Sequence, residues 1–528
     1  MVHLMPRKRV LIVNCYVDET RLPLRQPLIR PQAMAPAYLA GIFSASSCEI
    51  KLYDEVYSGP LEDEAMLGWP DMLVLSGLNV AFDRMLHLTA YARTKNRKII
   101  VVAGGPAIKV LKKFITHNRF FDYICTGDIE QIAEVIRDCW DENYISDTFR
   151  DKRWAIPRYD LVYWMQGLAY LEASRNCYYR CAFCSLTAEH AQYKHYDIDY
   201  IRAQFQALGK RRFVLFIDNN FYVRKKGMLE ERFSLLQELK NQGSFRRWGA
   251  LVTNDFFLSD QYLHMARESG CGALFSGVES LDRNTLLNFR KEQNTKINQF
   301  EAIEKCLDNG IAFLYGLMFD VTRRRISELK DEMDLILRHP RIPLPSFWTM
   351  AIPLMGTPLF YDAIQQEMFL PNVRIRDMDG RTIILKTLDP INEVVDFVRD
   401  MLRNKQLGGA IAKHMYQFWF SNRRSLERDS MLINLMSCNF GLLPSILKAR
   451  DWRYFFKGWF RFKRSIIVYE EALDDIYRPK LRVDPAYQSY FRPTMLTDNN
   501  GQIVEELRED FALSDPSRKI ITLFDQAS

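Results

Sequence analysis

The sequence lacks a long apolar run and has few cysteines for its length. No stretch approaches the roughly 18 uninterrupted apolar residues of a membrane-spanning helix, so we expect a soluble, cytoplasmic chain. Ten cysteines among 528 residues are too few for the disulfide framework of a small secreted fold. All but three of them stand alone in the sequence, at positions Cys15, Cys48, Cys125, Cys139, Cys271, Cys306 and Cys438.

Neither positive nor negative charge is in large excess. The chain has 72 Lys and Arg against 65 Asp and Glu, a net charge of +7, which does not call for a nucleic-acid partner. A hydrophobic content of 48% and a charged content of 26% are ordinary for globular proteins. The length predicts two or three domains, each with its own core.

The N-terminal part alternates short apolar runs with amphipathic segments, which predicts a doubly wound parallel sheet covered on both faces. The predicted strands are residues 10–14, 49–54, 72–77, 98–104 and 123–127. No G-x-G-x-x-G motif follows the first run, which disfavours a dinucleotide. Small residues stand at the carboxyl ends of three runs, where such sheets bind ligands; these are Ser76, Gly77, Gly104, Gly105, Pro106 and Gly127. Tight turns without a ligand are the alternative explanation.

A second alternating series predicts an open barrel of six β-α units, because six units are too few to close a barrel of eight. Its predicted strands are residues 169–173, 213–218, 248–253, 273–279, 311–319 and 346–353. We therefore expect an α/β chain with four parts: a Rossmann-like domain (1–145), a linker (146–165), a partial TIM barrel (166–390) and a mainly helical C-terminal region (391–528).

The remaining cysteines, Cys177, Cys181 and Cys184, form a C-x3-C-x2-C cluster after the first strand of the predicted barrel. A loop at that place is where a barrel of this type holds its reacting groups. Three thiolates could bind zinc with His190 or His195 as a fourth ligand, or an iron–sulfur cluster that leaves one iron open. A disulfide with one free thiol is disfavoured in a reducing compartment.

With Phe183 just before the last cysteine, this cluster resembles the signature of the radical S-adenosylmethionine (SAM) superfamily. The resemblance implies a [4Fe-4S] cluster on Cys177, Cys181 and Cys184, with SAM on the open iron and Phe183 beside it. It implies that one electron splits SAM and gives a 5′-deoxyadenosyl radical.

Three later strand ends also resemble the superfamily, at residues 217–221, 253–256 and 269–280. By this resemblance Asp218, Asn254 and Glu279 are candidates to hold the methionyl or ribose part of SAM. Each could instead neutralise an arginine or cap a helix. Residues 288–294 and 354–360 look like further segments of the superfamily, with Met355 where a proline is often found.

The N-terminal part resembles the cobalamin-binding domain that precedes the barrel in one branch of the superfamily, on residues 36–41, 101–106 and 122–130. The resemblance implies a cobalamin on the strand ends at Ser76, Gly77, Gly104, Gly105, Pro106 and Gly127. No D-x-H-x-x-G motif occurs, and His87 follows Asp83 by four residues, so a histidine ligand to cobalt is not expected. The lower face would meet a loop such as residues 20–34.

The two cofactors together imply a C-methyltransferase that removes hydrogen from an unactivated carbon and adds a methyl group from methylcobalamin. Members of the branch also cyclise, contract rings or oxidise without methyl transfer. A methylthiotransferase is disfavoured, because the N-terminal cysteines are scattered. The alternative from another class is a non-catalytic, membrane-associated protein that binds a cluster or cofactor. A small-molecule substrate and a protein that donates one electron are the expected partners.

The C-terminal region mixes basic and aromatic residues at 442–464. Such a segment could contact a membrane surface or the entrance of an apolar, lipid-like substrate, and Phe418, Trp419 and Phe420 could belong to the same surface. Alternatively, the aromatic rings pack on the barrel while the charges stay solvated. The last residues, from about Pro493, are predicted to form an extended arm without chemistry.

Overall fold

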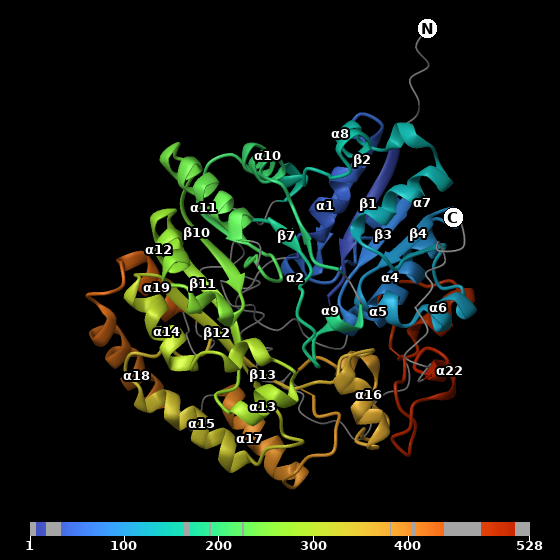
Figure 1. Ribbon diagram of the computed structural model, residues 1–528. Coiled ribbons are helices and arrows are strands. Elements are labelled where there is room, and N and C mark those ends of the chain that lie inside the picture. Colours follow the sequence, from blue (N-terminus) through green and yellow to red (C-terminus); the bar gives the residue numbers. More distant parts are fainter. Residues whose placement is uncertain are drawn as a thin grey trace.

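The structure is a computed structural model. It describes residues 7–16, 33–162, 168–189, 192–223, 226–380, 382–403, 408–437 and 477–512. The fold is α/β throughout most of this range, with a parallel sheet in the N-terminal unit and a second parallel sheet in the barrel unit (Figure 1).

The N-terminal unit is a five-stranded parallel sheet with the order β2-β1-β3-β4-β5. Its strands are β1 (Lys8–Asn14), β2 (Cys48–Asp54), β3 (Met72–Ser76), β4 (Ile100–Gly104) and β5 (Tyr123–Cys125). Alternate residues of β1 face opposite cores: Leu11 and Val13 pack on one side of the sheet, Val10 and Ile12 on the other. Burial on both faces explains why the strand is continuously apolar.

Helices cover both faces of this sheet. They are α1 (Ala35–Ile42), α2 (Glu55–Ser58), α3 (Glu64–Gly68), α4 (Phe82–Lys95), α5 (Pro106–Val110), α6 (Lys112–Asn118) and α7 (Ile132–Cys139), followed by α8 (Asp147–Lys152) in the connection to the barrel. The strand order reverses between β1 and β3, and ligands of open α/β sheets bind outside the carboxyl ends of the strands at such a point.

The second sheet has six parallel strands in the order β13-β12-β11-β10-β9-β6, so the barrel is open between β6 and β13. The strands are β6 (Leu168–Leu171), β9 (Arg211–Phe216), β10 (Phe245–Val252), β11 (Cys271–Glu279), β12 (Ala312–Phe319) and β13 (Phe347–Met350). A short antiparallel pair, β7 (Ser174–Arg175) and β8 (Lys194–His195), lies beside it. Each predicted strand of both sheets is confirmed within a few residues.

The outer layer of the barrel consists of helices that alternate with its strands. They are α10 (Ile198–Leu208), α11 (Lys226–Asn241), α12 (Asp260–Glu268), α14 (Gln299–Asp308) and α15 (Ile326–Arg338); shorter helices are α9 (Ser185–Ala188), α13 (Arg283–Asn288) and α16 (Pro358–Gln365).

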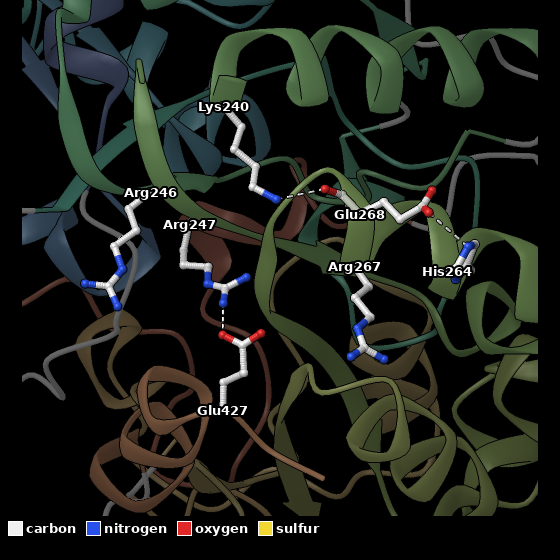
Figure 2. A pocket seen from close by; sticks show the side chains of 7 residues that line it. All are labelled: Lys240, Arg246, Arg247, His264, Arg267, Glu268 and Glu427. Carbon is white, nitrogen blue, oxygen red and sulfur yellow. Dashed lines mark hydrogen bonds and ion pairs between the residues drawn. The ribbon is translucent and has the colours of Figure 1, made fainter. Parts of the chain in front are cut away.

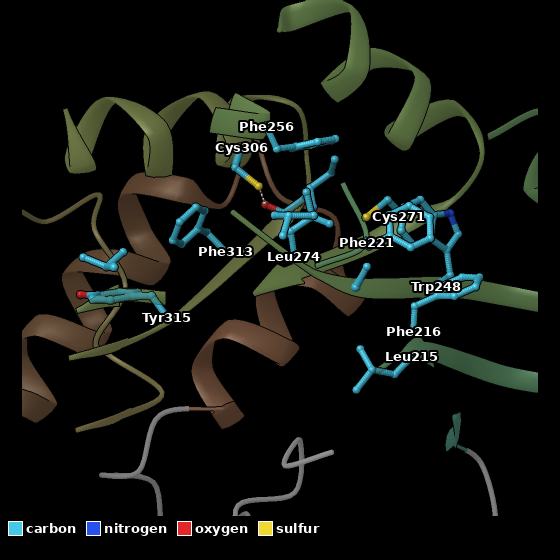
Figure 3. Packing of buried hydrophobic residues seen from close by; sticks show 14 of the residues in the cluster. Leu215, Phe216, Phe221, Trp248, Phe256, Cys271, Leu274, Cys306, Phe313 and Tyr315 are labelled. Atoms are coloured by element: carbon cyan, nitrogen blue, oxygen red, sulfur yellow. Dashed lines mark hydrogen bonds between the residues drawn. The ribbon is translucent and has the colours of Figure 1, made fainter. Parts of the chain in front are cut away.

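Large aromatic side chains fill the core between these helices and the sheet. Trp248 is fully buried, and its ring lies 5.5 Å from that of Phe221 and 6.0 Å from that of Phe216 (Figure 3). Its indole N–H donates to the carbonyl of Ser269 at 3.2 Å, which satisfies the one polar atom that the ring brings into the core. The core therefore holds the strands rigidly beneath their carboxyl ends.

Among the described residues, the C-terminal region is helical between residues 391 and 437, as the sequence predicts. Helices α17 (Ile391–Arg403), α18 (Gly408–Asn422) and α19 (Arg428–Ser437) pack on the barrel, where the side-chain amide of Asn434 donates to the carbonyl of Phe313 at 2.7 Å. Residues 442–464 lie outside the described part. Residues 477–512 contain only the short helix α22 (Glu505–Arg508) and a 3-10 turn at Pro485–Phe491.

Residues 477–512 return to the N-terminal unit (Figure 1). Tyr477 and Thr494 donate hydrogen bonds to the buried carboxylate of Asp83 on α4, at 2.9 and 2.6 Å. The ring of Phe491 stacks on His87 at 4.4 Å. The prediction of an extended arm from about Pro493 is wrong for residues 493–512, because Leu496, Leu507 and Phe511 are buried against the N-terminal unit. No helix of the described residues is both long and apolar enough to cross a membrane.

Candidate active site at the cysteine loop

The three predicted metal ligands lie on the loop between β7 and α9, beyond the carboxyl end of β6. The residue before the first cysteine, Asn176, has a left-handed backbone with φ of 64°. Its amide N–H donates to the side chain of Asn219 at 3.1 Å, and its own side chain donates to the carbonyl of Gln192 at 2.8 Å. Asparagine tolerates this conformation better than most residues, so the loop begins at a fixed turn.

The second half of the loop is fixed by segments that follow other barrel strands. The N–H of Ala182 donates to the carbonyl of Phe289 at 2.8 Å, and its carbonyl accepts from the N–H of Leu359 at 3.0 Å. The hydroxyl of Thr187 donates to the carbonyl of Cys181 at 2.9 Å. The loop is therefore held at the mouth of the barrel by its own backbone and by the segments after β11 and β13.

All three thiols are free, with Cys181 buried and Cys177 and Cys184 half-buried. Burial raises the pKa of Cys177 and raises the pKa of Cys184 to about 11. Metal binding must therefore displace a proton from these two thiols. In the described residues no three Cys, His, Asp or Glu side chains converge around a single ion. His195, which a zinc site could use as its fourth ligand, is exposed on β8, and His190 lies outside the described part.

The surroundings of the cysteines fit a sulfur-ligated cluster. The side-chain amide of Gln293 donates to the sulfur of Cys181 at 3.5 Å, a contact that favours thiolate over thiol. The amide oxygens of Gln293 and Asn294 are buried and accept no hydrogen bond. Buried polar atoms without a partner are rare in native structures and indicate a missing group. Cys181 lies beside one of these amides, and the three sulfur donors of the loop are the donor set that an iron–sulfur cluster requires.

Asp218, a predicted SAM contact, lies just after β9 and is 1% exposed. Its carboxylate accepts from the N–H of Ala173 at 3.0 Å and from the hydroxyl of Ser174. Burial raises the pKa of Asp218, whereas the positive charge of nearby Arg232 and these two hydrogen bonds lower it. Asp218 therefore ties the ends of β6 and β9 together, and its contact with SAM stays a prediction.

Asn254, the second predicted SAM contact, is fully buried. Its oxygen accepts from the hydroxyl of Ser276 at 2.5 Å, and its side-chain nitrogen donates to Gln299. Both ends of the amide thus have protein partners, so a contact with SAM also stays a prediction.

Glu279 ends β11 with a left-handed backbone, φ of 64°, at a point where the register with β12 shifts. Its carboxylate lies 2.5 Å from the ammonium group of Lys291. Phe183 packs edge-on against Phe289 at 5.3 Å, and its ring centroid lies 5.5 Å from the ammonium group of Lys291. The structure thus brings Phe183 and Glu279 together through a residue that our sequence interpretation did not assign. The sequence did contain a signal for this contact, because Lys291 and Gln293 both lie in the segment 288–294 that resembles the superfamily.

The glycines at the strand ends of the N-terminal unit differ in how closely neighbouring atoms approach them. Gly105 has φ of 112°, and a Cβ there would lie 2.5 Å from the carbonyl oxygen of Gly77. A Cβ on Gly77 would lie 2.8 Å from the Cβ of Ala81. These two glycines are therefore required by the approach of neighbouring loops. Gly104 has more room, with its nearest neighbour at 3.6 Å.

The other predicted cobalamin contacts also have roles in the local backbone. The carbonyl of Ser76 accepts from the N–H of Cys15 at 2.7 Å, Pro106 begins α5, and the N–H of Gly127 donates to Gln131 at 2.8 Å. Contacts of these six positions with cobalamin stay predictions, and most of the proposed lower-face loop, residues 20–32, is outside the described part.

Ion pairs join the strand ends of the N-terminal unit to the cysteine loop. The guanidinium of Arg175 lies 3.0 Å from Glu130, which follows β5, and 3.0 Å from Glu172, which follows β6. Lys109 of α5 pairs with Glu189 after α9 at 2.5 Å. The carboxyl ends of both sheets therefore face a common region, as two cooperating cofactors would require.

A cavity of about 550 Å³ opens at the opposite end of the barrel (Figure 2). Its lining includes Arg246 and Arg247, which stand at the start of β10, whereas Asn254 follows the end of that strand. Arg246 pairs with Asp429 at 2.8 Å and Arg247 pairs with Glu427. This charged cavity is therefore separate from the cysteine loop, and its position at the amino ends of the strands is typical of stability rather than chemistry.

Residues 171–333 match the model of the radical SAM superfamily. This part of the chain is therefore a radical SAM domain. The match begins in β6 and includes the three cysteines, Asp218, Asn254 and Glu279. The match confirms the resemblance to the superfamily, and the binding of a cluster by Cys177, Cys181 and Cys184 stays a prediction.

Two curated proteins are similar over part of their length. One is an uncharacterized methyltransferase of Synechocystis sp., 25% identical over 279 residues, which are 48% of this chain and 49% of that protein. The other is the bacteriochlorophyllide d C-12(1)-methyltransferase of Chlorobaculum tepidum, 27% identical over 195 residues, 36% of this chain and 41% of that protein. The match spans half or less of the length of these relatives.

Solved structures share the fold over a longer range. The cobalamin-dependent SAM radical enzyme OxsB, solved with aqua-cobalamin, matches with a TM-score of 0.55 and 15% identity over 88% of this chain and 82% of that one. The radical SAM methyltransferase TsrM of Kitasatospora setae, solved with tryptophan and a SAM analogue, matches with a TM-score of 0.50 and 14% identity over 69% and 78%. The likeness confirms the predicted fold, an α/β domain joined to a partial barrel.

Proposed function

We propose that this protein is a cobalamin-dependent radical SAM enzyme, and specifically a C-methyltransferase that acts on an unactivated carbon. The observation that carries the proposal is the position of the cysteine loop. It lies at the carboxyl ends of the barrel strands and is tied by Arg175 to Glu130, at the carboxyl edge of the N-terminal sheet. The two relatives named as methyltransferases support methyl transfer, and the fold shared with OxsB supports the pair of cofactors.

In this proposal Cys177, Cys181 and Cys184 hold a [4Fe-4S] cluster, and SAM binds against Phe183, Asp218, Asn254 and Glu279. Cobalamin lies on the strand ends at Ser76, Gly77, Gly104, Gly105, Pro106 and Gly127. When bound, these groups supply a hydrogen-abstracting radical and a methyl group.

The protein's own contribution is placement. Arg175 and Lys109 keep the two sets of strand ends together, and the buried amides of Asn254 and Gln293 hold the mouth of the barrel in one arrangement. Fixed geometry of this kind directs a reactive species to one atom and keeps solvent away from it.

The substrate we propose is a small molecule with an apolar, lipid-like or ring-shaped body. The Chlorobaculum tepidum relative is named for bacteriochlorophyllide d, and TsrM was solved with tryptophan. Both ligands carry flat apolar rings.

We further propose a cytoplasmic location with peripheral contact to a membrane through residues 442–464 and the exposed face of α18. On that face Tyr416, Trp419 and Phe420 are 64%, 42% and 51% exposed, and the guanidinium carbon of Arg423 lies 3.8 Å from the ring centroid of Phe420. Exposed aromatic rings beside a cation are typical of surfaces that bind anionic lipid. A one-electron donor protein would act as the redox partner, with no role for nucleic acid.

The proposal is tested by purifying the protein under anaerobic conditions and measuring iron, sulfide and cobalamin. A loaded enzyme should hold about four irons per chain and show the absorbance of a corrin. With reductant and SAM it should release 5′-deoxyadenosine, and the Cys181→Ala variant should release none. Wild-type protein that binds zinc or no metal would contradict the proposal.

A second candidate is a radical enzyme that cyclises, contracts a ring or oxidises without transferring a methyl group. The structural match to the cobalamin-dependent radical enzyme OxsB extends over 88% of this chain and supports this second candidate. Metabolites of cells with and without the protein distinguish the two, because only a methyltransferase shifts a product by one methyl mass. A non-catalytic role would leave both the metabolites and SAM unchanged.

A further inference from the structure

Lys291 is a buried cation at the mouth of the barrel and is not among the residues proposed to hold the cluster, SAM or cobalamin. The residue is 7% exposed, and its ammonium group lies 2.5 Å from the carboxylate of Glu279. It follows Arg290, which has a left-handed backbone with φ of 52°. Glu279 itself is left-handed, with φ of 64°, so a residue of the pair and the residue beside its partner both adopt a backbone that an L-residue reaches only at a cost.

The ion pair packs closely against the backbone of Gly277. A Cβ on Gly277 would lie 2.3 Å from the carboxylate oxygen of Glu279 and 2.7 Å from the ammonium nitrogen of Lys291. A buried ion pair is weak evidence for stability, because two apolar side chains in its place are often as stable or more so. Strained backbone around a costly pair indicates a function other than stability.

The cysteines are the neighbours that such a function would serve. The ammonium nitrogen of Lys291 lies 5.5 Å from the centroid of Phe183, which stands between Cys181 and Cys184 in the sequence. Two residues further on, the side-chain amide of Gln293 donates to the sulfur of Cys181 at 3.5 Å. One short segment thus brings both a cation and a hydrogen-bond donor to the cysteine loop.

Lys291 remains charged in this environment. The carboxylate of Glu279, 2.5 Å away, favours the charged form of the ammonium group and offsets the cost of its burial. A permanent charge in a buried site is screened little by water and acts strongly on a neighbouring redox group.

We propose that Lys291 sets the reduction potential of the iron–sulfur cluster on Cys177, Cys181 and Cys184. The positive charge of Lys291 raises this potential, the negative charge of Glu279 lowers it, and the hydrogen bond from Gln293 raises it to a smaller extent. The inference rests on the proposed function, since it requires the cluster. When the donor protein delivers one electron, the cluster gains one negative charge and no proton moves, because Lys291 is already protonated. The cation stabilises the reduced form and the carboxylate of Glu279 opposes it. Net charge and hydrogen bonds to sulfur are known determinants of such potentials.

The experiment is a redox titration of the cluster, followed by electron paramagnetic resonance of its reduced form, in anaerobic protein without SAM. Omitting SAM separates the electrostatic role of Glu279 from any role in binding. We expect Lys291→Met to shift the midpoint potential to more negative values, Glu279→Gln to shift it to less negative values, and the double variant to lie between them, near the wild type. Lys291→Arg should restore most of the potential, because it keeps the charge.

A matched control is Lys305→Met, which removes an outer lysine that pairs with Asp260 at 3.2 Å on the helical layer and should leave the potential unchanged. Gln293→Leu should give a smaller negative shift than Lys291→Met. These variants keep the test decisive if Lys291→Met fails to fold or to load its cluster. A purely structural role would not produce shifts of opposite sign that cancel.

Potentials that are the same in the wild type, Glu279→Gln and Gln293→Leu would overturn the inference while leaving the proposed function intact. A wild-type protein that holds no cluster would overturn the proposed function first, and the inference with it. The two failures are therefore distinguishable by the iron content of the wild type.

Discussion

The guanidinium of Arg175 lies 3.0 Å from the carboxylate of Glu130, and this pair joins the two halves of the molecule two residues before Cys177. The same guanidinium lies 3.0 Å from Glu172 and 5.8 Å from the ring centroid of Tyr38 on α1. One side chain thus contacts the N-terminal sheet, its first helix and the first barrel strand.

Replacing Arg175 by methionine should destabilise the protein by about 3–5 kcal/mol, because it leaves two largely buried carboxylates without a counter-charge. The free energy of unfolding from chemical denaturation measures this loss. The control is Arg202→Met, which removes an exposed pair with Glu238 at 2.7 Å and should cost no more than about 1 kcal/mol. Equal losses in the two variants would show that Arg175 is an ordinary surface residue.

His87 should make stability depend on pH. Burial above all, with Arg84 and Arg376, holds the pKa of its imidazole well below the ordinary value, so the folded protein keeps it neutral. Below a pH of about 6.5 the unfolded chain takes up a proton that the folded chain does not. Its contribution to stability is therefore complete above that pH and falls by up to about 1.4 kcal/mol for each pH unit below it.

Unfolding curves between pH 7.5 and pH 5.5 for the wild type and His87→Leu test this expectation. The variant should lose less stability on acidification, because leucine fills the space between Tyr477 and Phe491 without titrating. Identical slopes in the two proteins would mean that other groups cause the dependence on pH.

Gly105→Ala should destabilise the N-terminal unit and weaken cobalamin retention. The added Cβ would lie 2.5 Å from the carbonyl oxygen of Gly77 at φ of 112°, so the loops after β3 and β4 must separate. Gly209→Ala is the matched control: its φ is 68°, but no atom lies within 4 Å of the added Cβ, and the cost should be about 1 kcal/mol. Thermal unfolding and the corrin content of purified protein measure both effects.

Phe491→Ala should destabilise the N-terminal unit by about 3–5 kcal/mol, because it leaves a cavity beside His87 and Tyr91. The ring of Phe491 is fully buried and lies 5.3 Å from that of Tyr91. Tyr416→Ala removes an aromatic ring that is 64% exposed and should change stability by less than about 0.5 kcal/mol. Urea denaturation distinguishes the two, and a small loss for Phe491→Ala would mean that residues 477–512 add little to the core.

Serine at both Trp419 and Phe420 should reduce binding to vesicles that contain phosphatidylglycerol. Flotation with vesicles of phosphatidylcholine alone shows how far anionic headgroups matter, and added salt should weaken the interaction. Leu335→Ser, at a residue of α15 that is 44% exposed, is the control and should bind like the wild type. Unchanged flotation of the double variant would exclude α18 as a membrane contact.

Much of the fold could be predicted because burial imposes a local pattern. Every residue of β12 is buried, so its sequence is apolar without alternation, and the strand stands out from the amphipathic helices on either side. The three cysteines were equally visible, since their spacing within one loop already places them together. Features carried by short segments were therefore accessible from the sequence.

Features that depend on distant contacts were not. The pairing of Glu279 with Lys291 requires the register shift in β11 and two left-handed residues, and no local pattern marks either. The docking of residues 477–512 was missed for the same reason, because this segment has almost no helix or strand periodicity. Its apolar residues are buried by α4, nearly 400 positions earlier; the bond from Tyr477 to Asp83 spans 394 residues.

The return of residues 477–512 to α4 has a consequence for biosynthesis. A ribosome makes the first sheet long before residues 477–512, yet His87 and Asp83 find their neighbours only when that segment emerges. The N-terminal unit thus matures late relative to its synthesis, and chaperones or cofactor-loading factors would encounter it with an uncovered helix until residues 477–512 have docked.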